Sequence, residues 1–274
     1  MHSAMYCGIF LGVMLGETAI GGSGMNNGNS AAAARRLKAV FWVFMGLWLA
    51  SFPALAGDWI VVAAAGYKRP VLELIERYRA LTGQTVVGGF GNMQQISAQA
   101  QASADVGLML GDEAHLRDLP FVASLTPLGV GKLVLAWPKG KAALSADADL
   151  LAPGVGRIAC PDAKKAIYGI AASEWMKNKG LAEALKPKLI EVATVPQVTS
   201  YLISAEVDAG FINLTDALGA GDKIGGYRVI ESGYTTIRIV AGVIKGHENG
   251  AQVKGFLTFM NSPDAAAILK AYGM

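Results

Sequence analysis

Residues 160–181 read CPDAKKAIYGIAASEWMKNKGL, and this stretch decides the fold class. The residues just before it, 157–159, have the composition of a short buried strand, which the dipeptide Pro161-Asp162 ends in a turn. A helix is predicted from about Ile167, because the apolar residues that follow recur at spacings of three and four. Gly180 ends the helix where left-handed backbone is favoured. The residues on the apolar face are Tyr168, Ala171, Ala172, Trp175 and Met176.

The stretch is therefore predicted to be a strand, a turn and a packed helix. A helix N-terminus presents unpaired backbone N–H groups and a partial positive charge, which together suit an anion. Ordinary α/β packing without a ligand is the alternative interpretation, because most such units bind nothing.

The same alternation of strands and helices extends on both sides of this stretch. A continuous apolar run, typical of a strand buried on both faces of a parallel sheet, occurs at 58–65, and further strands are predicted at 104–109 and 132–137. Helices are predicted from Pro70 to a stop at Gly83 and over 93–102, with a glycine-rich loop at 88–92. The remaining strands are predicted at 85–87, 157–159, 189–193, 207–212, 227–230 and 235–244, and the remaining helices over 196–205 and near both 253–260 and 263–272.

This order predicts an α/β protein of two lobes with a cleft between them. Each lobe is expected to hold a mostly parallel sheet flanked by helices, with two strands crossing between the lobes. The first lobe is predicted to comprise residues 57–137 and 242–274, and the second residues 138–241.

The N-terminal part has the three features of a secretory signal peptide over residues 35–56. A basic cluster at 35–38 precedes an apolar run at 39–49, and Ala54-Leu55-Ala56 is a small-x-small cleavage site. We expect cleavage after Ala56 and a periplasmic protein, with an N-terminal membrane anchor as the alternative. Residues 1–34 contain glycine- and asparagine-rich segments and are expected to be an unstructured or mis-annotated extension, with a true translation start at Met25 as one interpretation.

Charge and cysteine content exclude several classes of partner. The net charge of +3 is small, and the signal segment takes away more basic than acidic residues, so neither nucleic acid nor an anionic membrane surface is expected as a partner. Only Cys160 remains after the predicted cleavage, so no internal disulfide is expected. Cys160 is interpreted as a small buried residue, with a reactive thiol as the alternative.

No catalytic or cofactor motif is present. His115 and His247 lie in no metal-ligand spacing, and the sequence has neither a nucleophile elbow nor a phosphate-binding glycine loop. The sequence therefore predicts no enzyme, no cofactor and no metal site.

Seven segments, taken in order along the chain, carry a family resemblance: 62–65, 104–106, 132–138, 166–172, 210–212, 262–266 and 272–273. Through these segments the chain, from about Trp59 to Met274, resembles the periplasmic molybdate-binding proteins of ABC transporters. The resemblance implies a two-lobe type II periplasmic-binding fold that closes on molybdate, tungstate or a related oxyanion and delivers it to an inner-membrane permease. In such proteins hydroxyls and backbone N–H groups hold the anion, and we expect a monomer.

The ligand-binding residues are predicted at the ends of four strands, and several depart from the family pattern. Gly66 stands where the family has serine or asparagine, and Asn92 and Met93 stand where it has a hydroxyl pair. Asn213 replaces an anion-binding tyrosine. Asn92, Gln94, Tyr168 and Asn213 can each donate, and Lys165 adds charge. The predicted set is Gly66, Tyr67, Asn92, Met93, Gln94, Lys165, Ala166, Tyr168 and Asn213.

Other interpretations stay open at this point. The cargo of the binding protein can instead be an organic acid or a phosphorylated metabolite, or the fold can carry a secreted enzyme or signalling module. Individually, Asn92 can shape its loop, Tyr168 and Met93 can serve packing, and Lys164 and Lys165 can be solvated surface residues.

Overall fold

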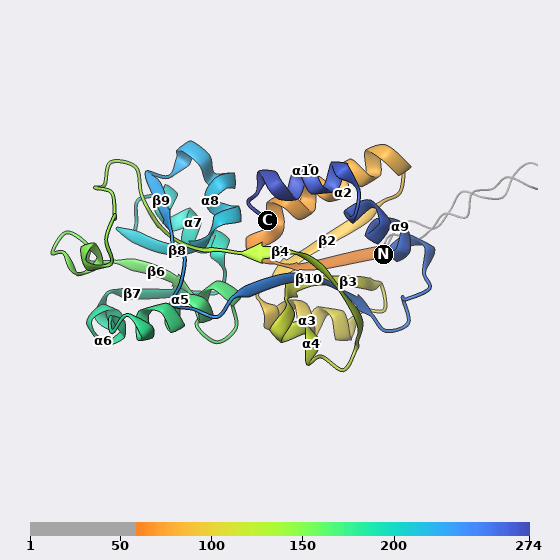
Figure 1. Ribbon diagram of the computed structural model, residues 1–274, viewed down its shortest axis with the longest axis horizontal. Helices are drawn as coiled ribbons and strands as arrows, with labels where there is room; N and C mark the ends of the chain where they lie inside the picture. The colour runs from red at the N-terminus through yellow and green to blue at the C-terminus, as the bar shows by residue number, and fades with distance from the viewer. Residues whose placement is uncertain (1–58) are drawn as a thin grey trace, which may run out of the picture. The chain divides into compact units, whose positions relative to one another are not determined.

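The computed structural model describes residues 59–274, and residues 57–274 form one compact unit. The signal segment predicted at 35–56 and the extension at 1–34 lie outside the described residues. The described part contains two five-stranded mixed sheets, which confirms the predicted α/β class (Figure 1). No helix within residues 59–274 is both long and apolar enough to cross a membrane.

The first sheet has the strand order β2-β1-β3-β10-β4. Its three strands β1, β2 and β3 are parallel, and β10 runs antiparallel to both β3 and β4. The side chains of β1 are almost all buried, as the continuous apolar run at 58–65 predicts, and those of β3 are buried to a similar extent. The strands span Trp59–Ala64 (β1), Val86–Gly91 (β2), Val106–Asp112 (β3), Val122–Gly131 (β4) and Ile237–Ile244 (β10).

Helices cover both faces of this sheet. In Figure 1, α2 and α10 lie on one side and α3 and α4 on the other. Gly83 ends α2 with φ +70°, as predicted, and its N–H donates to Arg79 O. Pro70 is the third residue of α2 rather than the first, still within the first turn, where its missing N–H costs nothing. The helical segments are η1 (Ala65–Tyr67, a 3₁₀ turn), α2 (Lys68–Thr82), α3 (Met93–Ala102), α4 (Glu113–Arg117), α9 (Ala251–Met260) and α10 (Pro263–Ala271).

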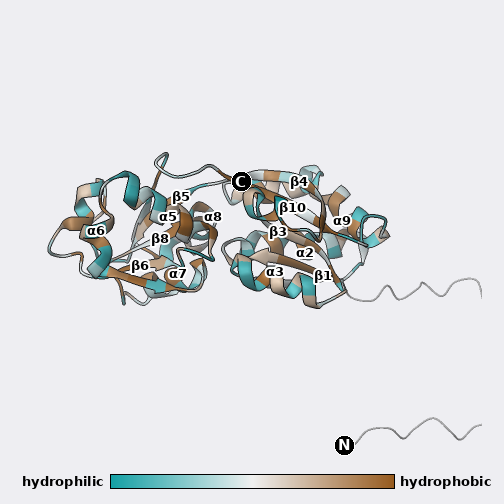
Figure 2. Ribbon diagram, turned by 90° about the horizontal axis from the view of Figure 1, so that it is seen from below, coloured by the Kyte–Doolittle hydropathy of each residue, from teal (hydrophilic) through white to brown (hydrophobic). Residues whose placement is uncertain are grey.

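The second sheet has the order β7-β6-β8-β5-β9. Here β6, β7 and β8 are parallel, and β5 is antiparallel to β8 and β9. The strands span Leu133–Trp137 (β5), Ile158–Pro161 (β6), Leu189–Val192 (β7), Ala209–Asn213 (β8) and Gly226–Val229 (β9). The helical segments are η2 (Asp147–Leu151), α5 (Ile167–Asn178), α6 (Ala182–Leu185), η3 (Lys186–Lys188), α7 (Val195–Ile203), α8 (Leu214–Ala220) and η4 (Gly221–Lys223). Figure 2 shows the hydrophobic residues concentrated on the central strands and the faces that pack on them.

The stretch from β6 to α5 forms as its sequence predicts. Helix α5 begins at Ile167, and its apolar face is buried. Gly180 follows the helix with φ +68°, its N–H donates to Lys177 O, and the N–H of Leu181 donates to Met176 O. These two bonds make a Schellman ending. Gly169 lies so close to β6 that a Cβ there would be 2.2 Å from Asp162 O, so no larger residue fits without movement.

Strand pairing divides the chain differently from the boundaries predicted at 137/138 and 241/242. β5 pairs in the second sheet, and β10 pairs from Ile237 onward in the first, so residues 235–244 do not form a strand shared by both sheets. An apolar run shows that a strand is buried but not which neighbours it has. We propose residues 59–131 with 237–274 as the first lobe and residues 133–229 as the second.

Two further expectations for the first sheet were wrong. The glycine-rich segment predicted as a loop at 88–92 belongs mostly to β2, an edge strand in which Gly89 allows close packing on Gln99. Strand β4 was not predicted, because it is also an edge strand and many of its side chains are exposed, so its apolar pattern is weak.

Cys160 lies in β6 and is buried, as predicted. Burial raises the pKa of its thiol to about 12, so the thiol stays protonated and a reactive role is not favoured.

Candidate functional site

Four segments that each lead into a helix meet around one small cavity, called here the inner cavity. They are the turn from β1 into η1 and α2, the turn from β2 into α3, the start of α5 and the start of α7. The cavity volume is about 20 Å³. One water needs roughly 10–15 Å³ on this scale, so the space suits a ligand only a little larger than water. First-turn N–H groups of the helices have no intrahelical acceptor and can donate to an anion.

Most of the ligand-binding residues predicted from sequence meet at this cavity. Gly66, Tyr67, Asn92, Met93, Ala166 and Tyr168 line it. Gln94 and Lys165 line a larger neighbouring cavity instead. Asn213 is fully buried and does not line the inner cavity, but its side chain is hydrogen-bonded to Gly66, which does.

Sequence reasoning missed two residues of this cavity, Thr194 and Val195, at the start of α7. The signal was available, since they follow the predicted strand at 189–193 just as the other candidate residues follow theirs. The rule that ligands bind beyond the carboxyl ends of parallel strands applies equally to this strand.

Two asparagines hold the geometry of the cavity. The side chain of Asn92 caps α3: its Oδ1 accepts from the N–H of Gln95 at 3.0 Å, and Gln95 Oε1 accepts from the N–H of Asn92 at 2.9 Å. Asn213 caps α8 by accepting from the N–H of Asp216 at 3.1 Å, and its Nδ2 donates to Gly66 O at 2.9 Å. Asn213 thus fastens the β1–η1 turn of the first lobe to the second lobe.

Two buried tyrosines are among the residues that line the cavity. The hydroxyls of Tyr67, from the first lobe, and Tyr168, from the second, are hydrogen-bonded to each other. Burial raises the pKa of both tyrosines, and their mutual contact adds to the rise at Tyr67. Both hydroxyls therefore keep their protons; one proton forms the bond between them, and the other can be donated elsewhere. Gly131, at the end of β4, lies against the two hydroxyls, and a Cβ there would be 2.2 Å from Tyr168 Oη.

The charge of Lys165 does not reach the inner cavity. Its side chain lies along the larger cavity, about half exposed, with Nζ 3.7 Å from Asp162 Oδ2. Its backbone has a different role, because Lys165 O accepts from the N–H of Met93 at 3.1 Å and joins the two lobes. None of the described residues that line the inner cavity is charged. An anion there would be held by backbone N–H groups and neutral side chains.

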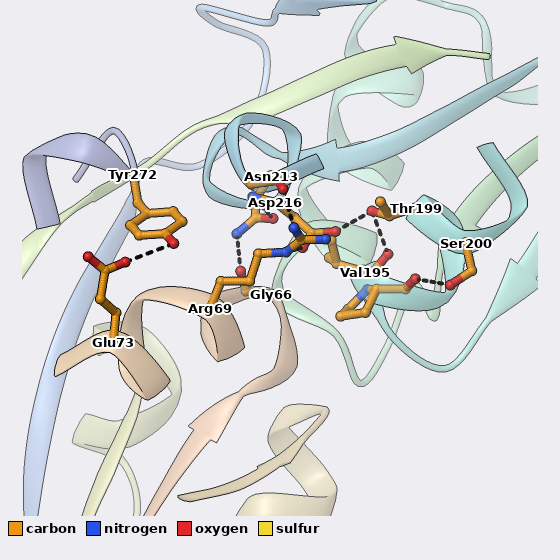
Figure 3. Close-up of polar contacts among 11 residues, drawn as sticks. Gly66, Arg69, Glu73, Val195, Thr199, Ser200, Asn213, Asp216 and Tyr272 are labelled. Atoms are coloured by element: carbon orange, nitrogen blue, oxygen red, sulfur yellow. Dashed lines mark hydrogen bonds and ion pairs between the residues drawn. The ribbon is translucent and has the colours of Figure 1, made fainter. Parts of the chain in front are cut away.

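A buried polar network joins the lobes behind the inner cavity (Figure 3). Arg69, in the first turn of α2, donates to Gly219 O and lies 3.3 Å from Asp216 Oδ1. Thr199 donates to the other oxygen of Asp216. Burial raises the pKa of Asp216, and Thr199 and Arg69 offset part of the rise. The network connects α2, α7 and α8, and two of these helices start near the cavity.

The larger neighbouring cavity, called here the outer cavity, has a volume of about 520 Å³. It lies between α3 and α4 of the first lobe and α5 of the second, with residues 235–237 beside it. Met93 and Ile167 line both cavities. Among residues 59–274 there is no group of three or more His, Cys, Asp or Glu side chains that could hold a metal ion.

Comparison with known proteins places this architecture in a class. Residues 60–274 match the family described as bacterial extracellular solute-binding protein, and the chain belongs to that family. It is 30% identical over 231 residues to the molybdate-binding protein ModA of Rhodobacter capsulatus, a match that covers 81% of this chain and 90% of the relative. It is 28% identical to the molybdate-binding protein ModA of Azotobacter vinelandii, over 84% of this chain and 95% of the relative.

The solved structures agree. The periplasmic molybdate-binding protein of Azotobacter vinelandii superposes with a TM-score of 0.72 and 27% identity, over 79% of this chain and 98% of that chain. The substrate-binding domain of a putative molybdenum ABC transporter from Clostridium difficile, at 23% identity and a TM-score of 0.61, shares the fold. The predicted family resemblance and the two-lobe periplasmic-binding fold are confirmed.

Replacing Tyr168 with phenylalanine tests the hydroxyl pair. The change leaves the Tyr67 hydroxyl buried without its partner, which should lower the free energy of unfolding by about 1–3 kcal/mol. Urea denaturation of the two proteins measures the difference. Tyr201→Phe is the control, because Tyr201 is partly exposed and its hydroxyl makes no hydrogen bond among residues 59–274. Equal stability of Tyr168→Phe and Tyr201→Phe would contradict the pairing.

Proposed function

We propose that this protein binds a small inorganic oxyanion, molybdate or tungstate foremost, in the inner cavity and delivers it to an ABC permease. The observation that carries the proposal is the meeting of four helix-leading segments at an uncharged cavity of about 20 Å³. A fully deprotonated tetrahedral anion needs donors on its oxygens; helix N-termini supply N–H donors without acceptors, and a neutral hydroxyl can donate one proton. The relatives named as molybdate-binding proteins support the choice of anion.

The residues at which this chain departs from the family pattern fit the proposal only in part. Gly66 and Met93 offer no side-chain hydroxyl, while Tyr67 and Tyr168 bring hydroxyls to the same cavity. The amide of Asn213 is engaged within the protein: its Nδ2 donates to Gly66 O, its Oδ1 accepts from the N–H of Asp216, and its side chain is also hydrogen-bonded to Tyr168. We therefore do not assign it to the anion. It acts instead by holding Gly66. The groups we assign to the anion are the first-turn amides of Tyr67, Ile167, Tyr168 and Val195, with the one hydroxyl of the Tyr67–Tyr168 pair whose proton is not used within the pair.

The setting of this function follows from the same proposal. The protein is exported to the periplasm with cleavage after Ala56, acts there as a monomer, and meets its permease with the ligand enclosed between the lobes. It is a binding protein rather than an enzyme. The relatives are binding proteins, which supports this assignment.

A thermal-shift titration with molybdate, tungstate, sulfate and phosphate tests the ligand. At 100 times its dissociation constant, a ligand stabilises the folded protein by about 2.7 kcal/mol, which for a chain of this size raises the melting temperature by roughly 5–10 °C. We expect this rise with molybdate or tungstate and a smaller one with phosphate, whose protonated form needs an acceptor. No response to any of the four anions would refute the proposal.

A further inference from the structure

The outer cavity has no role in binding a bare inorganic anion, yet it adjoins the inner cavity directly. Met93 and Ile167 form the shared wall. Beyond this wall the outer cavity continues along apolar side chains of α5, including Ile170, which is 41% exposed although it is large and apolar. A volume of about 520 Å³ lies within the roughly 300–1,000 Å³ typical of small-molecule sites.

The chemistry of the shared wall differs from that of the rest of the inner cavity. The side chains of Met93 and Ile167 carry no hydrogen-bond donor. On this side only the N–H of Ile167 can donate, because the N–H of Met93 is bonded to Lys165 O. An oxygen of an inorganic tetrahedral anion that faces the two side chains therefore lacks a donor, and an unpaired buried oxygen is costly. An oxyanion with one organic substituent has only three terminal oxygens, and its fourth substituent needs space and apolar contact instead of a donor.

We propose that the site accepts organic oxyanions of the type R–PO₃, with the three oxygens in the inner cavity and a neutral substituent R in the outer cavity. The inference rests on the proposed function, because the inner cavity must first hold an oxyanion. Lysines and carboxylates both line the outer cavity, namely Lys164, Lys165, Asp112 and Glu174. Their charges balance, so the substituent needs no charge of its own.

A homologous series of alkylphosphonates tests the proposal. Methyl-, ethyl-, propyl- and butylphosphonate are titrated at pH 8 into the purified protein by calorimetry, with molybdate, tungstate and phosphate beside them. Each added methylene that enters an apolar cavity should tighten binding about fourfold. A flat or falling series, in a protein that binds molybdate or tungstate, would overturn the inference and leave the proposed function intact. A protein that binds none of these anions would overturn both.

A matched pair of variants locates the substituent. Ile170→Trp fills the outer cavity, whereas Ile203→Trp places the same side chain at a similarly exposed position of α7 (44% exposed) outside both cavities. We expect Ile170→Trp to weaken butylphosphonate binding at least tenfold and to flatten the dependence on chain length. Ile203→Trp should leave the affinity for butylphosphonate and the dependence of affinity on chain length within twofold of the values for the unmodified protein. Identical behaviour of the two variants would refute the placement of R in the outer cavity.

Discussion

Replacing Gly169 with alanine should destabilise the second lobe strongly. A Cβ at this position would lie 2.2 Å from Asp162 O and 2.4 Å from Pro161 O, and both are backbone atoms that cannot rotate away. Helix α5 must therefore move off β6. Overpacking of this kind costs about 1–3 kcal/mol and occasionally more, while the better helix propensity of alanine returns at most about 1 kcal/mol. We expect the free energy of unfolding to fall by about 2 kcal/mol or more.

The displacement of α5 should also weaken ligand binding. Ile167 and Tyr168 begin α5 and line the inner cavity, so a displaced helix misplaces their amides. We expect at least a tenfold loss of oxyanion affinity in calorimetry, beside the loss of stability in urea. Gly154→Ala is the control, because a Cβ there meets nothing within 4 Å and its φ is not positive. If Gly169→Ala matched Gly154→Ala in stability, the close contact between α5 and β6 would be wrong.

The second large effect is expected for Asp216→Ala, in the network behind the cavity. The change removes the acceptor for the Thr199 hydroxyl and the partner of Arg69. Breaking a buried pair costs about 3–5 kcal/mol, and the figure must be reduced here because the Arg69 side chain is 37% exposed. We expect a loss of about 2–3 kcal/mol in urea denaturation.

Asp216→Asn keeps the size and shape of this side chain and removes its negative charge. Burial is the largest influence on this carboxyl and raises its pKa, so the folded protein holds the Asp216 proton more tightly than the unfolded chain does. The stabilisation that comes from this tightly held proton is fully present below the ordinary pKa of an aspartate, about 3.9. It is lost as the pH rises through the pKa that Asp216 has in the folded protein. The neutral amide should therefore cost less than about 1 kcal/mol near pH 7 and should remove this pH dependence. A cost equal to that of alanine would show that the charge itself is required.

The sequence could predict the parts of this structure that local pattern determines. The spacing of apolar residues after Ile167 predicts α5, and Gly83 and Gly180 mark helix ends through backbone that few other residues adopt. Residues at the ends of parallel strands converge because the topology brings these ends together, which is why Gly66, Asn92 and Tyr168 were found.

The sequence could not predict the contacts between lobes. Arg69 and Asp216 belong to helices from different halves of the chain, and Asn213 reaches Gly66 across the same boundary. No periodicity relates such residues. Strand β5 was assigned to the other lobe for a related reason: an apolar pattern indicates burial, whereas the choice of neighbouring strands depends on the whole sheet.

The bonds that join the lobes have a consequence for the speed of binding. In the structure, Met93 donates to Lys165 O, Tyr67 pairs with Tyr168, and Asn213 holds Gly66. Each of these bonds must break before the two lobes can separate around the inner cavity. The three bonds together should therefore slow the passage of an anion into and out of the cavity, and weakening one of them should accelerate both association and dissociation.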